Sequence, residues 1–186
     1  LPGGDVRSDG TAQDAGRLSP LVEVRVEALN RALAGLPRER TRYHMCWGAW
    51  SAPHVSDIEL KRVVDLVLQI DVAGFALEMG NARHEHEWRV WETVKLPAGR
   101  VLIPGVISHT THLVEHPELV AERIVRLAKL VGRENVIGGT DCGFAQTAST
   151  ARVHPTVMWA KLQSLVEGAR LASRELWGAR AAASAR

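Results

Sequence analysis

Four side chains of this sequence, spread widely along the chain, are of types that bind a transition metal. His44 and Cys46 stand two apart in RYHMCWG, so on a β-strand both side chains would point to the same face. Glu78 closes the apolar run GFALE, and Cys142, the second of two cysteines, stands in GTDCGF. Two thiolates, one imidazole and one carboxylate suit a tetrahedral Zn²⁺ ion. We therefore predict a zinc site formed by these four residues.

Burial in the core is the alternative explanation for each of these residues taken singly. A lone cysteine often serves as a small buried apolar residue, and His-x-Cys by itself has little specificity. The glutamate argues against this explanation, because a carboxylate that ends a buried strand needs a partner. Both cysteines at one end of the fold, together with that glutamate, favour metal binding.

Four apolar runs that alternate with helical segments must position these side chains. The runs are typical of β-strands and cover residues 40–48, 72–80, 100–108 and 135–144. Helices are predicted over residues 21–36, from a Ser-x-x-Glu capping box at Ser56 to Val67, over residues 84–94, from Pro117 to Gly132, and from Pro155 to Trp177. This alternation indicates parallel βαβ units.

The spacing of the polar groups makes the fold prediction more specific. Cys46, Glu78, the stretch 108–110 and Cys142 follow one another at intervals of about 32 residues, the length of one βα unit. They would then lie at the C-terminal ends of four successive strands, where parallel α/β folds gather reactive groups. A (β/α)8 barrel needs about 250 residues, and this chain holds four units. The predicted fold class is α/β, the C-terminal half of a TIM barrel; a small doubly wound sheet is the alternative.

The composition along the chain predicts one structured domain between two irregular ends. Residues 1–20 are rich in Gly, Asp, Ser and Pro and are predicted to be a flexible lead-in. Residues 21–178 form the partial barrel domain that carries the zinc site, and residues 179–186 are expected to be a frayed tail. No methionine starts the chain, which suggests a fragment, so we expect a missing N-terminal half-barrel as a partner.

The composition and charge of the chain indicate its expected partners and cellular location. The chain has 186 residues, 46% of them hydrophobic, which is enough to bury a core. Its 23 basic and 21 acidic residues nearly cancel, so we expect no nucleic acid and no membrane as a partner. No run of about 18 or more apolar residues predicts a membrane span. Two cysteines are too few for a disulfide framework, and a cytoplasmic location is expected.

Several long motifs, in order, carry a resemblance to a known family. HMCWG, LEMGNARHEHEW, PGVIS followed by VEHPELVAERIVRLAKLVG, and GTDCGF resemble the cobalamin-independent methionine synthases, especially the branch with the epoxyalkane:coenzyme M transferases. The similarity runs from about Val22 to Trp177. In that family the corresponding His-x-Cys, glutamate and distant cysteine bind zinc. The resemblance therefore implies the same four ligands, His44, Cys46, Glu78 and Cys142.

The activity implied by the resemblance is zinc-dependent transfer of a methyl or alkyl group to a thiol. In the methionine synthases the thiol is homocysteine and the donor is 5-methyltetrahydropteroyltriglutamate, and the zinc-bound thiolate is the nucleophile. Two alternatives stay open: alkylation of another small thiol, as in the coenzyme M transferases, and a structural zinc half-barrel without activity. Because the family's N-terminal half supplies much of the substrate site, this piece alone is predicted to be inactive.

Further candidates follow the second and third predicted strands. Arg83, His84 and His86 are predicted to contact substrate, with Arg83 suited to a carboxylate or sulfonate; a solvated charged loop is the alternative. His109 is a candidate proton shuttle for the leaving group. The methionine synthases have Asp-x-His near this point, whereas this chain reads ISHTTH. Asp141 is predicted either to orient a metal ligand or to bond nearby backbone amides.

Overall fold

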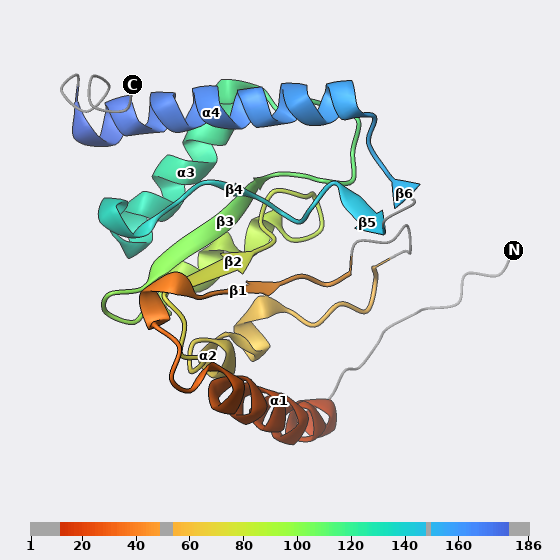
Figure 1. The fold of residues 1–186 in the computed structure, drawn as a ribbon, viewed down its shortest axis with the longest axis vertical. Coiled ribbons are helices and arrows are strands. Elements are labelled where there is room, and N and C mark those ends of the chain that lie inside the picture. The colour runs from red at the N-terminus through yellow and green to blue at the C-terminus, as the bar shows by residue number, and fades with distance from the viewer. Residues whose placement is uncertain (1–11, 49–53, 148–149, 179–186) are drawn as a thin grey trace, which may run out of the picture.

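The centre of the fold is a four-stranded parallel sheet. The computed structural model describes residues 12–48, 54–147 and 150–178, and Figure 1 shows their arrangement. The strands β1 (Arg42–Met45), β2 (Gly74–Leu77), β3 (Val101–Ile107) and β4 (Gly139–Thr140) lie side by side in chain order, and each neighbouring pair is parallel. The parallel α/β arrangement predicted from the sequence is therefore confirmed.

The helices flank this sheet at its two edges. Near β1 lie α1 (Ala12–Leu33) and α2 (Val64–Val67), and near β3 and β4 lie α3 (Pro117–Val131) and α4 (Pro155–Trp177) (Figure 1). Short 3-10 helices complete the connections: η1 (Arg38–Arg40), η2 (Leu60–Arg62), η3 (Glu85–Glu92) and η4 (Arg133–Asn135). A small antiparallel pair, β5 (Ala145–Thr147) and β6 (Thr150–Ala151), follows β4. Among the described helices, none is long and apolar enough to cross a bilayer.

Helix α3 begins and ends where the sequence predicts. The His116 side chain caps its first turn by accepting a hydrogen bond from the Glu118 amide, and Pro117 occupies the first helical position, which needs no amide donor. Gly132 ends the helix with φ 94°, a value that glycine adopts without steric cost.

Helix α4 packs closely on α3 at a glycine. A Cβ atom at Gly168 would overlap the side chain of Val120, so only glycine allows this approach. Pro155 stands in the first turn of α4, and His154 caps that turn by accepting from the Thr156 amide at 3.3 Å. The two longest helices of the C-terminal part therefore form one layer over β3.

Two apolar clusters hold the sheet to its helices. One joins β1, β2 and β3 to α2 and η3, and its fully buried members include Phe75, Leu77 and Leu102. The other joins β3 to α3 and α4 around Ile107 and Val120. At roughly 1.5–3 kcal/mol for each large apolar side chain removed from water, these clusters are the main source of stability.

The structure differs from the sequence prediction at the first helix and after Ser56. Helix α1 begins at Ala12 rather than near residue 21, so part of the predicted lead-in is helical; AQDAGRL is rich in residues that favour helix. Residues 1–11 and 179–186 lie outside the described residues. No capping box forms at Ser56: Glu59 is extended, and helical turns begin only at Leu60. The extended stretch carries Asp57 to the side chain of His84.

The fourth strand is shorter than predicted, with two paired residues and one isolated bridge between Leu102 and Val136. The pairing of β3 with β4 shifts between Gly105 and Ile107. Directly after Thr140, the Asp141 amide still donates to the Ile107 carbonyl of β3 at 2.9 Å, and its side chain accepts the amides of the loop after β2.

Candidate metal centre

The carboxyl ends of the four strands bring the predicted metal ligands together. Cys46 directly follows β1, Glu78 directly follows β2, and Cys142 comes two residues after β4. The third strand, β3, is followed by Ser108 and His109. Because the strands are parallel, all of these positions lie at one edge of the sheet.

The sulfur of Cys142 lies at the centre of this group. The His44 Nε2 atom is 3.0 Å from Cys142 Sγ, and the Glu78 Oε1 atom is 3.5 Å from the same sulfur. Donor atoms within 4.8 Å of one another form two overlapping sets of three: His44, Cys46 and Cys142, and Glu78, His109 and Cys142. The four residues predicted as zinc ligands therefore all belong to one cluster, which also includes His109.

Burial shifts the pKa values of Cys142, Glu78 and His44 toward the neutral forms of these groups. Burial and the nearby Cys46 thiol raise the pKa of Cys142 well above its usual range. Burial and the charge of Asp141 raise the pKa of Glu78, whose side chain is buried, and burial lowers the pKa of His44. A divalent cation reverses this balance, because it favours the thiolate and carboxylate forms that bind it. The donor set fits a zinc ion in chemistry and in proximity.

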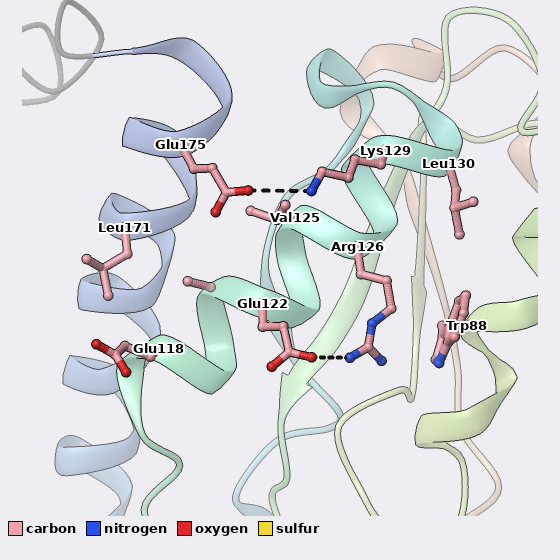
Figure 2. Close-up of a pocket in the computed structure, with 10 residues that line it drawn as sticks. Trp88, Glu118, Glu122, Val125, Arg126, Lys129, Leu130, Leu171 and Glu175 are labelled. Atoms are coloured by element: carbon pink, nitrogen blue, oxygen red, sulfur yellow. Dashed lines mark hydrogen bonds and ion pairs between the residues drawn. The ribbon is translucent and has the colours of Figure 1, made fainter.

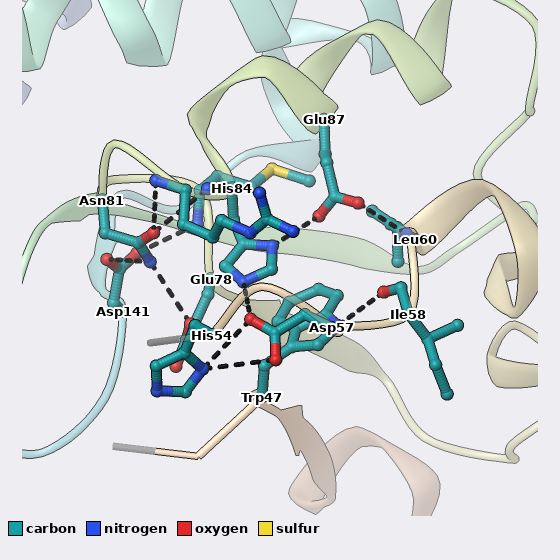
Figure 3. A network of polar contacts seen from close by, with 12 residues as sticks. Trp47, His54, Asp57, Ile58, Leu60, Glu78, Asn81, His84, Glu87 and Asp141 are labelled. Carbon is teal, nitrogen blue, oxygen red and sulfur yellow. Dashed lines mark hydrogen bonds and ion pairs between the residues drawn. The ribbon is translucent and has the colours of Figure 1, made fainter. Parts of the chain in front are cut away.

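A fully buried aspartate holds the loop that carries Glu78. The Asp141 Oδ1 atom accepts from the amides of Met79 at 2.9 Å and Gly80 at 2.7 Å, and Oδ2 accepts from the Asn81 side-chain amide at 3.0 Å (Figure 3). The same Asn81 nitrogen donates to Glu78 Oε2 at 3.2 Å. Asp141 therefore orients Glu78 through the loop after β2.

The backbone of β3 leaves the space that Asp141 needs. A Cβ atom at Gly105 would overlap the Asp141 side chain, so a glycine is required at that position. The sequence offered two roles for Asp141. The structure shows it bonding backbone amides, which belong to the loop that carries Glu78, and orientation of a metal ligand stays a prediction.

His84 joins two carboxylates beside the centre. Its Nδ1 is 3.1 Å from Glu87 Oε2 and its Nε2 is 3.1 Å from Asp57 Oδ2, while Glu87 Oε1 accepts from the Leu60 amide (Figure 3). Burial lowers the pKa of His84, but the hydrogen bonds of Glu87 and Asp57 and the charges of Glu87 and Glu78 outweigh it and raise the pKa overall. The buried imidazole therefore forms a structural link between the loop after β2 and the segment before α2.

The same imidazole fixes the residue next to Cys46. The rings of Trp47 and His84 stack with centroids 4.0 Å apart, and the Trp47 indole donates to the Ile58 carbonyl at 2.6 Å. Both ring nitrogens of His84 are thus engaged by carboxylates, and substrate contact by His84 stays a prediction. Sequence reasoning missed Asp57, whose only signal was its place in a polar loop.

Arg83 in the loop after β2 and His86 in η3, the other two predicted substrate contacts, are exposed. Arg83 donates from Nη2 to the Val55 carbonyl at 3.3 Å. Glu85, the first residue of η3, forms a two-pronged ion pair with Arg123, which also donates to the Val106 carbonyl at 2.9 Å. Substrate contact by Arg83 and His86 stays a prediction.

His109 lies at the end of β3 with 2% of its surface exposed. Burial, together with the positive charges of Arg152 and Lys161 and the nearby His44, lowers its pKa to about 4. This lowered pKa favours the neutral ring, and a role of His109 as proton shuttle stays a prediction.

A buried ion pair fixes the loop that carries His109. The Ser108 amide donates to Glu115 Oε1 at 2.8 Å, and Lys161 Nζ, fully buried on α4, binds Glu115 Oε2 at 2.8 Å. Lys161 also donates to the Leu113 carbonyl at 2.5 Å. Sequence reasoning missed this pair, since 46 positions separate its members.

A separate groove of about 620 Å³ lies between α3 and α4, away from the metal cluster (Figure 2). Its charged side chains are largely paired, Glu122 with Arg126 at 2.5 Å and Glu175 with Lys129 at 3.5 Å. None of the candidate ligands lines this groove. The carboxyl ends of the strands, rather than this groove, are therefore the candidate functional site.

Fold and cluster together define a parallel α/β domain of the TIM-barrel type with polar groups at the carboxyl ends of its strands. No protein-family model matches the chain. A solved B12-independent methionine synthase from a Shewanella species, in complex with selenomethionine, has a TM-score of 0.67 and 24% identity over 81% of this chain and 43% of that one. This likeness confirms that the chain has the fold of part of a TIM barrel.

A comparison with curated proteins also finds similarity to a methionine synthase. The methionine synthase of Thermococcus kodakarensis is 26% identical over 155 residues, which are 83% of this chain and 40% of that protein. The chain therefore spans less than half the length of the methionine synthases that it matches.

Proposed function

We propose that this chain carries the zinc centre of a thiol alkyltransferase of the methionine synthase type, with His44, Cys46, Glu78 and Cys142 as ligands. The observation that supports this most is the convergence of His44 and Glu78 on the sulfur of Cys142 from separate strand ends. The similarity to methionine synthases over most of the chain supports the same activity.

The bound zinc ion would keep a coordinated thiol deprotonated near neutral pH, whereas a free thiol has a pKa of about 8.5. His44, Cys46 and Cys142 supply the nitrogen and sulfur donors that hold the ion. Glu78 is the only oxygen donor in this set, so it is the ligand expected to give way to the substrate sulfur. Asn81 and Asp141 hold the loop from which Glu78 extends.

The reaction breaks an S–H and a C–N bond and forms an S–C and an N–H bond. The substrate thiol gives up its proton to water, its sulfur bonds to the methyl carbon, and the bond from that carbon to the donor nitrogen breaks with its electrons on nitrogen, which takes up a proton from water. Homocysteine is the proposed thiol and 5-methyltetrahydropteroyltriglutamate the proposed donor. With a small epoxide as the alternative electrophile, the ring carbon is attacked and the oxygen takes the electrons. Arg83 is proposed to pair with an acidic group on the thiol.

Catalysis is proposed to need a second polypeptide segment. The chain covers 40% of one relative and 43% of another, and the two outer strands of its sheet, β1 and β4, have one paired neighbour each among the described strands. We expect the N-terminal half of the barrel to pair with these strands and to supply the remaining contacts to thiol and donor, so that this chain by itself binds zinc without turnover.

Zinc binding is tested first, by metal analysis of the chain after reconstitution. We expect one zinc per chain, and Cys142→Ser should weaken the affinity, measured by competition with a chelator, by at least about tenfold. His112→Ala, on an exposed position outside the cluster, is the matched control and should bind like the wild type. Equal affinity of Cys142→Ser and wild type would contradict the proposed centre.

The catalytic and structural versions of the site are separated by adding homocysteine to the zinc-loaded chain. Zinc X-ray absorption should show two sulfur ligands before and three after the addition, because the thiol replaces Glu78. A purely structural centre, the alternative function, would keep two sulfur ligands throughout.

A further inference from the structure

The imidazole of His109 is buried beside the proposed zinc ligands. The residue is 2% exposed, and within the described parts of the chain neither ring nitrogen has an acceptor or donor. Buried polar groups are almost always paired, since an unpaired one loses its bonds to water without replacement. The position of the ring therefore points to a ligand that the protein atoms do not supply.

The atoms nearest to this ring are metal donors. A nitrogen of His109, an oxygen of Glu78 and the sulfur of Cys142 all lie within 4.8 Å of one another. Donor atoms around one tetrahedral zinc are about 3.3–3.8 Å apart, so a small rotation of side chains brings this set into range. Cys142 also belongs to the set with His44 and Cys46. The cluster thus offers five donors to an ion that takes four.

The backbone next to His109 is fixed by hydrogen bonds and an ion pair. These contacts hold the imidazole in its buried position. Glu115 accepts the amide of the neighbouring Ser108 at 2.8 Å and binds the buried Lys161 at 2.8 Å. Lys161 is fully buried and donates to Leu113 as well. The fold keeps an unpaired imidazole next to Glu78 and Cys142.

We propose that His109 is a reserve zinc ligand that takes the place of Glu78 when this carboxylate leaves the ion. The inference rests on the proposed zinc centre and deepens it. His44, Cys46, His109 and Cys142 then form a Cys2His2 set, which is a closed coordination typical of structural zinc sites. The chain would retain its metal in the interval between release of Glu78 and arrival of a thiol, and the thiol would have to displace His109.

The test is X-ray absorption at the zinc edge on the full chain, loaded with zinc alone, as wild type and as Glu78→Gln. The glutamine keeps the shape of the side chain and the acceptor for Asn81. We expect one imidazole in the wild type and two in Glu78→Gln, with two sulfurs in both. Glu78→Ala, with its fold checked by circular dichroism, should likewise show two imidazole ligands on zinc.

Chelator competition supplies the second readout. Glu78→Gln should bind zinc within about tenfold of the wild type, and the double variant Glu78→Gln/His109→Ala at least about tenfold more weakly than Glu78→Gln. Glu78→Gln/His112→Ala, altered at an exposed histidine of the same loop, should match Glu78→Gln.

One imidazole in Glu78→Gln, or equal affinity of Glu78→Gln with and without His109, would overturn the reserve-ligand role. Failure of the proposed function has a different signature: a wild-type chain that binds no stoichiometric zinc, or zinc without two sulfur ligands.

Discussion

Replacement of Asp141 by alanine should destabilise the chain and loosen the metal cluster together. The carboxylate is fully buried and accepts the amides of Met79 and Gly80, and at its other oxygen the side chain of Asn81. Each buried donor left without an acceptor costs about 1–3 kcal/mol. Two such amides set the scale, and relief of the buried charge offsets part of it. We expect a loss of about 3 kcal/mol in the free energy of unfolding, or about 6–12 °C in Tm.

Urea denaturation followed by tryptophan fluorescence measures this loss, with two variants for comparison. Asp141→Asn keeps an oxygen for the two backbone amides but turns an NH₂ group toward Asn81, so its loss should be smaller, about 1 kcal/mol. Asp65→Ala, on an exposed position of α2, should change stability by less than about 0.5 kcal/mol. Zinc affinity should fall by about 10–100-fold in Asp141→Ala, because Glu78 loses its oriented loop. Asp141→Ala with the stability and zinc affinity of Asp65→Ala would refute the role assigned to this carboxylate.

Three further outcomes are expected. Lys161→Met leaves the Glu115 carboxylate buried and unpaired, so urea denaturation should show a loss of about 3–5 kcal/mol; a loss under about 1 kcal/mol would contradict the pairing. The pKa of His84 is raised in the folded chain, so its contribution to stability is full below the unfolded pKa of about 6.5 and is lost as pH rises through the folded pKa. The stability difference between wild type and His84→Gln should therefore be larger at about pH 5.5 than at about pH 8.5; an equal or opposite difference would show that His84 is not held by its carboxylates. Gly168→Ala places a methyl group against Val120 and should cost about 1–3 kcal/mol in thermal unfolding, whereas Gly143→Ala, with open space around it, should cost less.

The clustering of these donor groups was largely predictable from the sequence, because Cys46, Glu78 and Cys142 each follow a strand at a regular interval. In a parallel sheet the carboxyl ends of all strands lie on the same side. A residue that directly follows an apolar run is therefore expected on that side, as Cys46, Glu78 and Cys142 are. The prediction for α3 succeeded for a similar reason, since Pro117 and Gly132 are strong local signals of helix ends.

The supporting contacts were not predictable, because they join segments whose separation follows no period. Asp57 meets His84 across 27 positions and Glu115 meets Lys161 across 46. The contact between Asp57 and His84 also accounts for the absence of the predicted capping box at Ser56. The segment is extended there, and this conformation brings the Asp57 carboxylate to the buried imidazole. His109 stood out by sequence as a histidine at a strand end, but its missing partners are visible only in three dimensions.

The candidate metal ligands join the two outer strands of the sheet. β1 and β4 are the outer strands of the sheet, and three inter-strand spacings would separate them by about 14 Å if the sheet were flat. Yet the Nε2 atom of His44 on β1 and the Sγ atom of Cys142, two residues after β4, lie 3.0 Å apart, so these two side chains meet across the carboxyl ends of the strands. A zinc ion bound there would link positions 98 residues apart, and its binding energy would contribute directly to folding. Removal of bound zinc should therefore lower the Tm of this chain, even though the ion would lie at the strand ends and outside the apolar core.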